Sequence, residues 1–321
     1  MQYRKLGRAG VLVSVIGLGT NRFGSDSVSQ EDVNTIMDAA EDLGINFIDT
    51  ANTYTQGRSE ETLGKALKGR WDRFVLATKF CIKVGDGPND RGGSRYHIMN
   101  SVEDSLRRLQ NDYIDLYYVH RWDEGTPIDE TLRALDDLVR MGKVRYLGAS
   151  EFASWQLAES NVLAELHGWT ALTALQSHYH MMDRDVEREV LPCCQAKEVG
   201  FVPFFPLAGG FLTGKYKRGE PAPAGSRGES SGYVQQYMTD ENYDMVEKLT
   251  VWAADHGRGM NELAHAWLLA QPTVCSVISG ATGLEQMQDN AKAADWVLSQ
   301  DELAEINAIG AIHAPVLRSE S

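Results

Sequence analysis

Short apolar runs alternate along the chain with segments in which apolar residues recur every three or four positions. The runs end at polar or turn-forming residues and occupy positions 16–19, 46–49, 74–79, 114–119, 146–150, 174–177, 201–205 and 274–279. Their length and near-continuous apolar character are typical of strands that are covered on both faces. The pattern therefore predicts eight buried strands.

Between these runs, the apolar positions follow the period of a helix. The period is clear in residues 33–40, 128–139 and 284–294. Ser29 precedes the first of these segments and is expected to cap its helix. Thr126 and Pro127 precede the second, where threonine is expected as the cap and proline as the first helical residue.

The alternation of strands and helices predicts a parallel sheet. Eight such units in about 300 residues match a closed (β/α)₈ TIM barrel, with a doubly wound open sheet as the alternative. Residues 16–21, IGLGTN, lack the third glycine and the following helix of a dinucleotide fingerprint, which disfavours a Rossmann fold. We expect one α/β domain over residues 1–321, with an N-terminal β-hairpin that closes the bottom of the barrel. Two long polar loops, 83–96 and 209–240, are expected on its C-terminal face.

Composition limits the classes of partner. The chain has 321 residues and a formal net charge of −14, which argues against nucleic acid or anionic membranes as main partners. It has no run of 18 apolar residues, and its first residues lack the apolar core of a secretory signal. We therefore expect a cytoplasmic protein with no membrane association and with a possible homo-oligomeric state.

The four cysteines, Cys81, Cys193, Cys194 and Cys275, form no CxxC pair. In a reducing compartment such residues are expected to be small buried hydrophobes. A metal site that combines Cys193 and Cys194 with nearby histidines matches no zinc spacing, so we predict no metal.

Polar residues with chemical potential follow consecutive strands. Asp49 ends the second strand, Lys79 ends the third and His120 follows the fourth, while Tyr54 lies just beyond Asp49. In a barrel, the carboxyl ends of neighbouring strands meet at one rim, so these four side chains are expected to converge. Taken singly, each would be read as a capping or surface residue.

Together, these four residues can protonate a carbonyl oxygen. A tyrosine has a pKa of about 10. A neighbouring lysine ammonium is expected to lower that pKa, and a carboxylate to hold the lysine. A neutral histidine can orient the substrate oxygen. The reaction needs a hydride source, which predicts a nicotinamide cofactor. The alternative is a lysine that forms an imine, as in a lyase, but a carboxylate beside Lys79 would keep it protonated.

Longer motifs resemble one known family. FIDTANTYTQGRSEETLGKAL is similar to the aldo-keto reductase signature, and LATKF, DYIDLYYVHRWD, GKVRYLGAS, ALQSHYHMMDR, PLAGGFLTGKY and SGATGLEQMQDN follow in the family's order. The bacterial branch that resembles potassium-channel β-subunit-like reductases is the most similar. The resemblance implies that Asp49, Tyr54, Lys79 and His120 form the catalytic tetrad, with Tyr54 as the proton donor.

The same resemblance implies a set of cofactor contacts. Ser150 and Gln176 would hold the nicotinamide carboxamide, Phe204 would stack on the ring, and Thr20, Asn21 and Asp49 would lie beside it. Pro206, Leu207, Ala208 and Gly210 would follow the pyrophosphate, with Lys215 and Arg227 supplying positive charge. Gly280, Thr282, Gln286 and Asn290 would meet the adenosine end.

Three features modify this set of contacts. Glu151 stands where family members usually have asparagine, which puts an amide contact in doubt. Phe205, adjacent to Phe204, is a second aromatic candidate. Gly280 and Gln286 occupy positions at which some members carry lysine and arginine for the extra phosphate of NADPH. Thr282 and Gln286 are nevertheless similar to the serine and glutamine of the channel-β-like branch, so we expect NADP(H), with NAD(H) as the alternative.

Aromatic residues near the rim are candidates for the substrate pocket: Phe23, Phe80, Trp122 and Trp155. Such a lining suits apolar or sugar-like carbonyl compounds, while Arg22 and Arg121 would favour an anion. We therefore expect reduction of an aldehyde or ketone to an alcohol. The alternative is a nicotinamide-binding regulatory subunit with little turnover. The resemblance implies that channel β subunits replace the tetrad histidine with asparagine, so His120 favours the enzyme.

Overall fold

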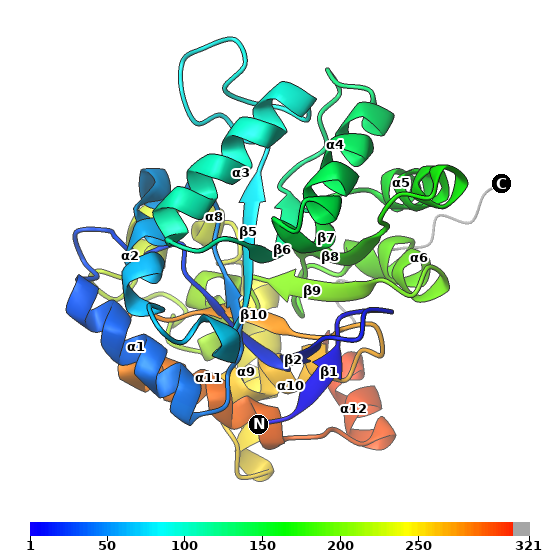
Figure 1. Cartoon of the computed structure of the whole chain (residues 1–321). Coiled ribbons are helices and arrows are strands. Elements are labelled where there is room, and N and C mark those ends of the chain that lie inside the picture. Colours follow the sequence, from blue (N-terminus) through cyan, green and yellow to red (C-terminus); the bar gives the residue numbers. More distant parts are fainter. Residues whose placement is uncertain (311–321) are drawn as a thin grey trace, which may run out of the picture.

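The computed structural model describes residues 1–310, and residues 311–321 lie outside the described part of the chain. Eight parallel strands close into a barrel in the order β10-β3-β4-β5-β6-β7-β8-β9, surrounded by helices (Figure 1). Their bounds are β3 Ile16–Gly19, β4 Phe47–Asp49, β5 Val75–Phe80, β6 Ile114–Val119, β7 Val144–Ser150, β8 Leu172–His178, β9 Gly200–Phe204 and β10 Val277–Gly280. Closure confirms the predicted TIM barrel over the open sheet.

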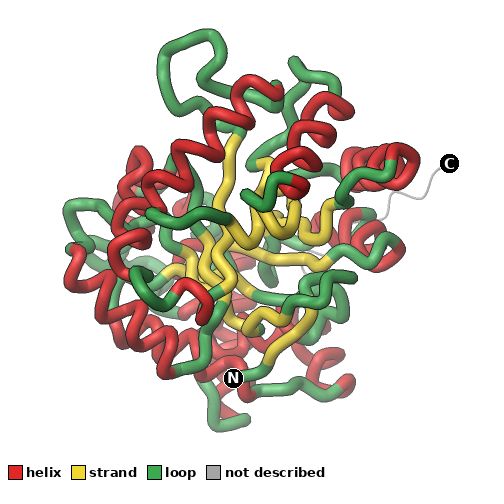
Figure 2. The backbone as a smooth tube through the Cα atoms, viewed as in Figure 1, coloured by secondary structure: helices red, strands yellow, loops and turns green. Residues whose placement is uncertain are grey.

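The helices form the outer layer, which Figure 2 shows around the central strands. Those of seven or more residues are α1 Gln30–Asp42, α2 Arg58–Ala66, α3 Arg95–Leu109, α4 Ile128–Arg140, α5 Ser154–His167, α6 Val190–Ala196, α9 Asp240–Asp255, α10 Met260–Leu269, α11 Leu284–Lys292 and α12 Gln300–Gly310. None of these helices is long and apolar enough to span a bilayer.

One of the two predicted helix caps, Ser29, is confirmed, and the other is displaced by one residue. Ser29 caps α1, where its hydroxyl accepts a hydrogen bond from the Asp32 backbone nitrogen. The prediction for α4 is displaced by one residue, because Pro127 has an extended ψ of 131° and is the cap residue itself. The Thr126 hydroxyl instead donates to Asp123, 2.7 Å away.

The strands separate two cores because successive side chains point to opposite faces. Along β5, Leu76 and Phe80 belong to the outer core between strands and helices, whereas Val75 and Ala77 belong to the inner core of the barrel. Lys79 has the same parity as Val75 and Ala77. The alternation therefore carries Lys79 into the barrel at its carboxyl end.

An antiparallel hairpin closes the amino end of the barrel, as predicted. It consists of β1 (Tyr3–Lys5) and β2 (Leu12–Ser14). Leu6, Ala9 and Val13 fill the inner core below the strands. Gly7 allows a close approach: its φ is +59°, and a Cβ there would lie 2.5 Å from the Gly200 backbone nitrogen. The hairpin therefore packs directly on β9.

Both predicted long loops follow strands at the carboxyl end of the barrel. Residues 83–94 are irregular between β5 and α3. The segment predicted as one loop over 209–240 instead includes most of the 3₁₀ turn Ala208–Thr213 and the short helices α7 (Arg227–Ser230) and α8 (Gly232–Gln235). These elements overhang the rim at which the strand-end polar residues meet.

Candidate active site

The four strand-end residues form one cluster, called the tetrad here. Lys79 Nζ lies 2.6 Å from Asp49 Oδ2 and 3.3 Å from Tyr54 Oη. The rings of Tyr54 and His120 lie 6.1 Å apart in an edge-to-face arrangement. The closed barrel thus brings together a carboxylate, an ammonium, a phenol and an imidazole.

Lys79 is fully buried, and its ammonium has three acceptors in reach. It donates to Asp49 and to the Thr50 carbonyl oxygen, 2.8 Å away, and it contacts the Tyr54 hydroxyl. Burial alone would lower the pKa of Lys79, but the charge of Asp49 and the contact with Tyr54 outweigh it and raise that pKa. The lysine is therefore held as a cation, which opposes imine formation.

The pKa of Tyr54 differs from the sequence-based expectation of a lowered value. Burial raises the pKa of Tyr54 above its usual 10, and the opposing effect of the Lys79 charge is smaller. The expectation considered the cation but not the loss of solvent around the phenol. Tyr54 is consequently a protonated donor at neutral pH.

His120 is neutral. Burial, followed by the charges of Lys79 and Arg121, lowers its pKa to about 3. Its Nδ1 is buried and has no hydrogen-bond partner among residues 1–310. A neutral imidazole offers one donor and one acceptor, so His120 can hydrogen-bond a substrate oxygen without adding charge.

A tight turn presents the Tyr54 hydroxyl to the cluster. Tyr54 opens the 3₁₀ turn Tyr54–Gly57, in which Thr55 and Gln56 have φ of 47° and 61°. These left-handed conformations are uncommon outside glycine and asparagine. The Thr55 hydroxyl donates to the Phe23 carbonyl oxygen at 2.7 Å, which anchors the turn.

Gln176 has a structural contact that the sequence did not indicate. Its Nε2 donates to Asp49 Oδ1 at 2.9 Å, across 127 positions of sequence. The Asp49 carboxylate is thus held on both oxygens, by Gln176 on one side and by Lys79 on the other. Ser150, the other predicted carboxamide ligand, is buried in the neighbouring strand β7 and pairs with Gln176 in the register of the sheet.

A second buried carboxylate supports the cluster from behind. Glu60 is fully buried on α2, accepts from the Thr78 hydroxyl at 2.6 Å, and pairs with Arg108 Nε at 2.7 Å. Thr78 directly precedes Lys79 in β5. Glu60 lies within the signature stretch GRSEETLG, but nothing in that stretch alone predicts its contacts with Thr78 and Arg108.

Two hollows adjoin the tetrad. The tetrad pocket has a volume of about 290 Å³. Among the predicted cofactor contacts it is lined by Thr20, Asn21, Asp49, Ser150, Gln176, Phe204, Pro206, Arg227 and Gly280. The second hollow, called the long groove, measures about 750 Å³ and is lined by Leu207, Gly210, Lys215, Thr282, Gln286 and Asn290, besides four residues of the first set. Ala208 is fully buried and lines neither hollow.

The long groove suits an anionic ligand. Arg22, Lys215 and Arg227 line it, and none of them forms an ion pair within residues 1–310. Burial, together with the nearby Arg22 charge, lowers the pKa of Arg227. Three cationic side chains that form no ion pair with carboxylates of the described residues can pair with the phosphates of a dinucleotide. Asp289, which the sequence analysis missed, lines the same groove and pairs with Lys292 at 2.7 Å.

The aromatic residues predicted for the substrate pocket lie elsewhere. Phe23 and Phe80 are fully buried in the outer core, and the Phe80 ring stacks on Tyr117. Phe80 cannot share a pocket with Lys79 because adjacent strand residues face opposite sides. Trp122 is half-buried, packs edge-on against Phe152 and Trp155, and does not line the tetrad pocket.

No group of three or more potential metal-ligating side chains occurs among residues 1–310. Cys193 and Cys194 are free thiols there, and burial raises the pKa of both.

Comparison with known proteins gives a family match over nearly the whole chain. A model described as "Aldo/keto reductase family" matches residues 15–311. A "Probable voltage-gated potassium channel subunit beta" of Oryza sativa subsp. japonica is 35% identical over 100% of this chain and 99% of that protein. "Uncharacterized oxidoreductase YrpG" of Bacillus subtilis (strain 168) is 37% identical over 96% of both chains. "L-glyceraldehyde 3-phosphate reductase" of Escherichia coli (strain K12) is 34% identical over 96% of this chain and 92% of that protein.

Proposed function

The chain belongs to the aldo/keto reductase family, and we propose that it reduces an aldehyde or ketone to an alcohol with Tyr54 as the proton donor. The observation that carries this proposal is the position of the Tyr54 hydroxyl. It lies 3.3 Å from the fully buried Lys79 ammonium and beside the neutral His120, at the wall of a pocket. A phenol so placed can transfer its proton to a developing alkoxide.

Each tetrad residue has a separate task in this proposal. A bound nicotinamide cofactor supplies the hydride. His120 donates a hydrogen bond to the carbonyl oxygen and fixes its position beside Tyr54. Tyr54 then gives its proton to that oxygen. Lys79 stabilises the phenolate that remains, and Asp49 with Gln176 keeps the ammonium in place.

We propose NADP(H) as the cofactor, held along the tetrad pocket and the long groove. The support is the set of cationic side chains in the groove and the similarity of Thr282 and Gln286 to the channel-β-like branch. Gln286 Oε1 already accepts from the Thr282 hydroxyl at 3.0 Å and from its backbone nitrogen. With its oxygen engaged, Gln286 keeps its amide nitrogen as a donor for a ligand in the groove that it lines.

The second candidate function is a nicotinamide-binding regulatory subunit. It rests on relatives that are named as voltage-gated potassium channel subunits. The neutral, pocket-lining His120 favours the reductase, because a binding subunit needs no group to orient a reacting oxygen.

One experiment tests these alternatives. NADPH and NADH are titrated into the wild type and Tyr54→Phe by fluorescence, and cofactor oxidation is followed with 4-nitrobenzaldehyde. We expect turnover to fall by about 10²–10⁴-fold in Tyr54→Phe, because the proton donor is lost. Cofactor affinity should change little, because the variant keeps the ring. Tyr96→Phe, on the exposed surface of α3, is the matched control and should behave as the wild type.

Tight NADPH binding by the wild type without oxidation by any of a panel of aldehydes and ketones would favour the regulatory subunit. Failure to bind either nicotinamide cofactor would contradict both candidates.

A further inference from the structure

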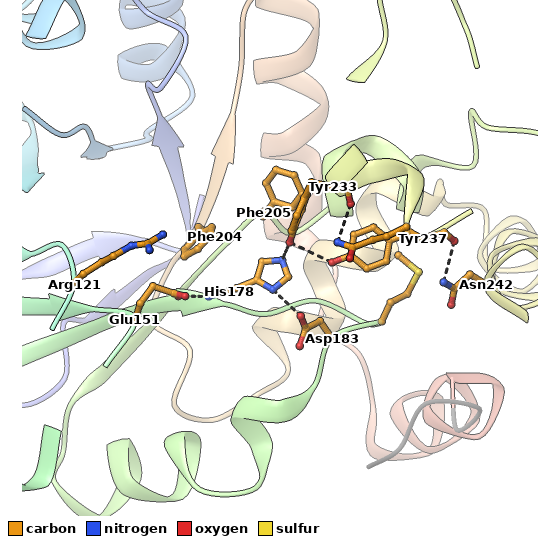
Figure 3. A pocket seen from close by; sticks show the side chains of 11 residues that line it. Arg121, Glu151, His178, Asp183, Phe204, Phe205, Tyr233, Tyr237 and Asn242 are labelled. Atoms are coloured by element: carbon orange, nitrogen blue, oxygen red, sulfur yellow. Dashed lines mark hydrogen bonds and ion pairs between the residues drawn. The ribbon is translucent and has the colours of Figure 1, made fainter. Parts of the chain in front are cut away.

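A third hollow, called the side pocket, opens next to the tetrad pocket and measures about 690 Å³ (Figure 3). Arg121, Glu151, Phe204 and Phe205 line both pockets and form the junction between them. A molecule whose carbonyl group reaches Tyr54 can therefore extend past this junction into the side pocket.

A hydrogen-bonded chain builds the far wall of the side pocket. His178 Nδ1 lies 2.8 Å from an Asp183 carboxylate oxygen, and the Tyr233 hydroxyl bonds His178 Nε2. The Tyr237 hydroxyl lies 3.2 Å from that of Tyr233. Figure 3 shows this chain running from Asp183 through His178 and Tyr233 to Tyr237. The carboxylate can only accept, so His178 Nδ1 carries a proton, and the Tyr233 hydroxyl continues the chain at Nε2. The wall is thus ordered before any ligand enters.

Two residues at the junction have unusual backbone conformations. Glu151 has φ +56° and Phe205 has φ +64°, in the left-handed region. Asparagine or glycine adopts this region at lower cost than glutamate. Residues held in this region cluster at active sites and ligand clamps, where the surrounding structure fixes them. Position 151 therefore carries a carboxylate although the backbone there favours another residue.

Glu151 has acceptor capacity left for a ligand. One of its oxygens accepts from the His178 backbone nitrogen at 3.0 Å. The other makes no hydrogen bond within residues 1–310, and the side chain is exposed to the hollow. A carboxylate accepts up to about four hydrogen bonds, so this oxygen can receive hydroxyl donors.

The mixed charge of the side pocket restricts the class of ligand. Glu151 and Asp183 supply negative charge, and Arg121 supplies positive charge at the junction. A phosphate would meet two carboxylates, and an ammonium would meet the arginine. A purely apolar chain would remove solvent from all three groups without replacing its hydrogen bonds. A neutral molecule rich in hydroxyl groups satisfies both signs, and the rings of Phe204, Phe205 and Tyr233 can pack on its C–H faces.

We propose that the side pocket binds the hydroxylated part of a neutral polyhydroxy aldehyde or ketone, and that Glu151 determines this specificity by accepting its hydroxyl hydrogens. The proposal rests on the proposed reductase function, because the carbonyl end of the same molecule must reach Tyr54. It assigns the side pocket a binding role and leaves the tetrad chemistry unchanged.

The test compares kcat/KM for erythrose with kcat/KM for butanal, which has the same carbon chain without the hydroxyl groups. The wild type is compared with Glu151→Gln in the presence of saturating NADPH. The share of each substrate that is present as the free aldehyde does not depend on the enzyme variant. It therefore cancels when variants are compared on the same substrate. We expect the erythrose-to-butanal ratio to fall by about five- to tenfold in Glu151→Gln, because a neutral amide accepts more weakly than a carboxylate. The kcat/KM for erythrose 4-phosphate, relative to butanal, should rise in the same variant.

Two further variants separate specificity from folding. Glu151→Asn removes the carboxylate and suits the left-handed backbone, so its Tm should equal or exceed that of the wild type while the ratio falls. Glu165→Gln, an exposed position on α5, removes the same charge elsewhere and should leave the ratio unchanged.

A ratio that stays within about twofold of the wild type in both Glu151 variants would overturn the specificity proposal alone. A wild type that reduces neither butanal nor 4-nitrobenzaldehyde would overturn the reductase function and this inference together.

Discussion

At the amino end of the barrel, Leu6, Ala9 and Val13 of the hairpin fill the inner core. At the carboxyl end the same strands present Asp49, Lys79 and Gln176 to one another. Both ends are buried, and both are lined by inward-facing residues of the strands. One end contains apolar contacts and the other an ion pair with its hydrogen bonds.

This difference separates stability from chemistry within one barrel. Apolar burial stabilises a fold in proportion to area, whereas an ion pair taken out of water gains little net free energy. Stability therefore does not explain why Lys79 and Asp49 are buried. In the proposed reaction the buried Lys79 ammonium stabilises the phenolate of the adjacent Tyr54, and this explains their position. The two ends are expected to respond differently to substitution.

The largest effect is expected at Lys79. Lys79→Met should reduce turnover by at least about 10²-fold. It should also lower the free energy of unfolding by about 3–5 kcal/mol, because Asp49 is left buried without its cation. Urea unfolding and NADPH oxidation measure the two effects. In the double variant Lys79→Met/Asp49→Asn, most of the stability should return while turnover stays low. Recovery of turnover in the double variant would contradict the role given to the charge.

A smaller effect, confined to stability, is expected at the opposite end. Leu6→Ala should lower the free energy of unfolding by about 2–5 kcal/mol, because it opens a cavity where the hairpin closes the barrel. The turnover of the folded fraction should be unchanged. Leu12→Ala, at an exposed position of the same hairpin, should change stability by less than about 0.5 kcal/mol. A large loss of kcat in Leu6→Ala would show that the two ends are coupled.

The smallest effect is expected from pH. The pKa of His120 is about 3, so it stays neutral through the assay range, and no inflection is expected near 6.5. The pKa of Tyr54 is raised above 10, so the proton donor is present at neutral pH and is lost only as pH rises through that raised value. The kcat/KM for carbonyl reduction should therefore vary by less than about twofold between pH 6 and 9. A bell-shaped profile with an acid limb near 6.5 would contradict the neutral state of His120.

Sequence periodicity predicted much of the framework. It placed all eight strands within a few residues, because each is a short apolar run between turn-forming residues. It also placed Asp49, Lys79 and His120 at strand ends, and parallel strands bring such ends to one rim. The shift at β10, which begins at Val277, arises because Val274 makes only a single bridge to Phe201.

One error was avoidable from the sequence alone: Phe80 is the neighbour of Lys79, and adjacent strand residues face opposite sides, so both cannot line one pocket. Other features required the folded chain. The raised pKa of Tyr54 depends on how much solvent the closed barrel excludes. The contact between Gln176 and Asp49 and the contact between His178 and Tyr233 join segments that are distant in sequence.

The sequence by itself determined the alternation of strands and helices, and with it which residues stand at the ends of strands. These properties are local, because side-chain direction repeats every two residues in a strand and every 3.6 in a helix. Only the tertiary structure decided which strand ends meet, how deeply each charge is buried and which loops enclose the pockets. Those properties depend on the closure of the barrel, which sets distances between segments that no local pattern relates.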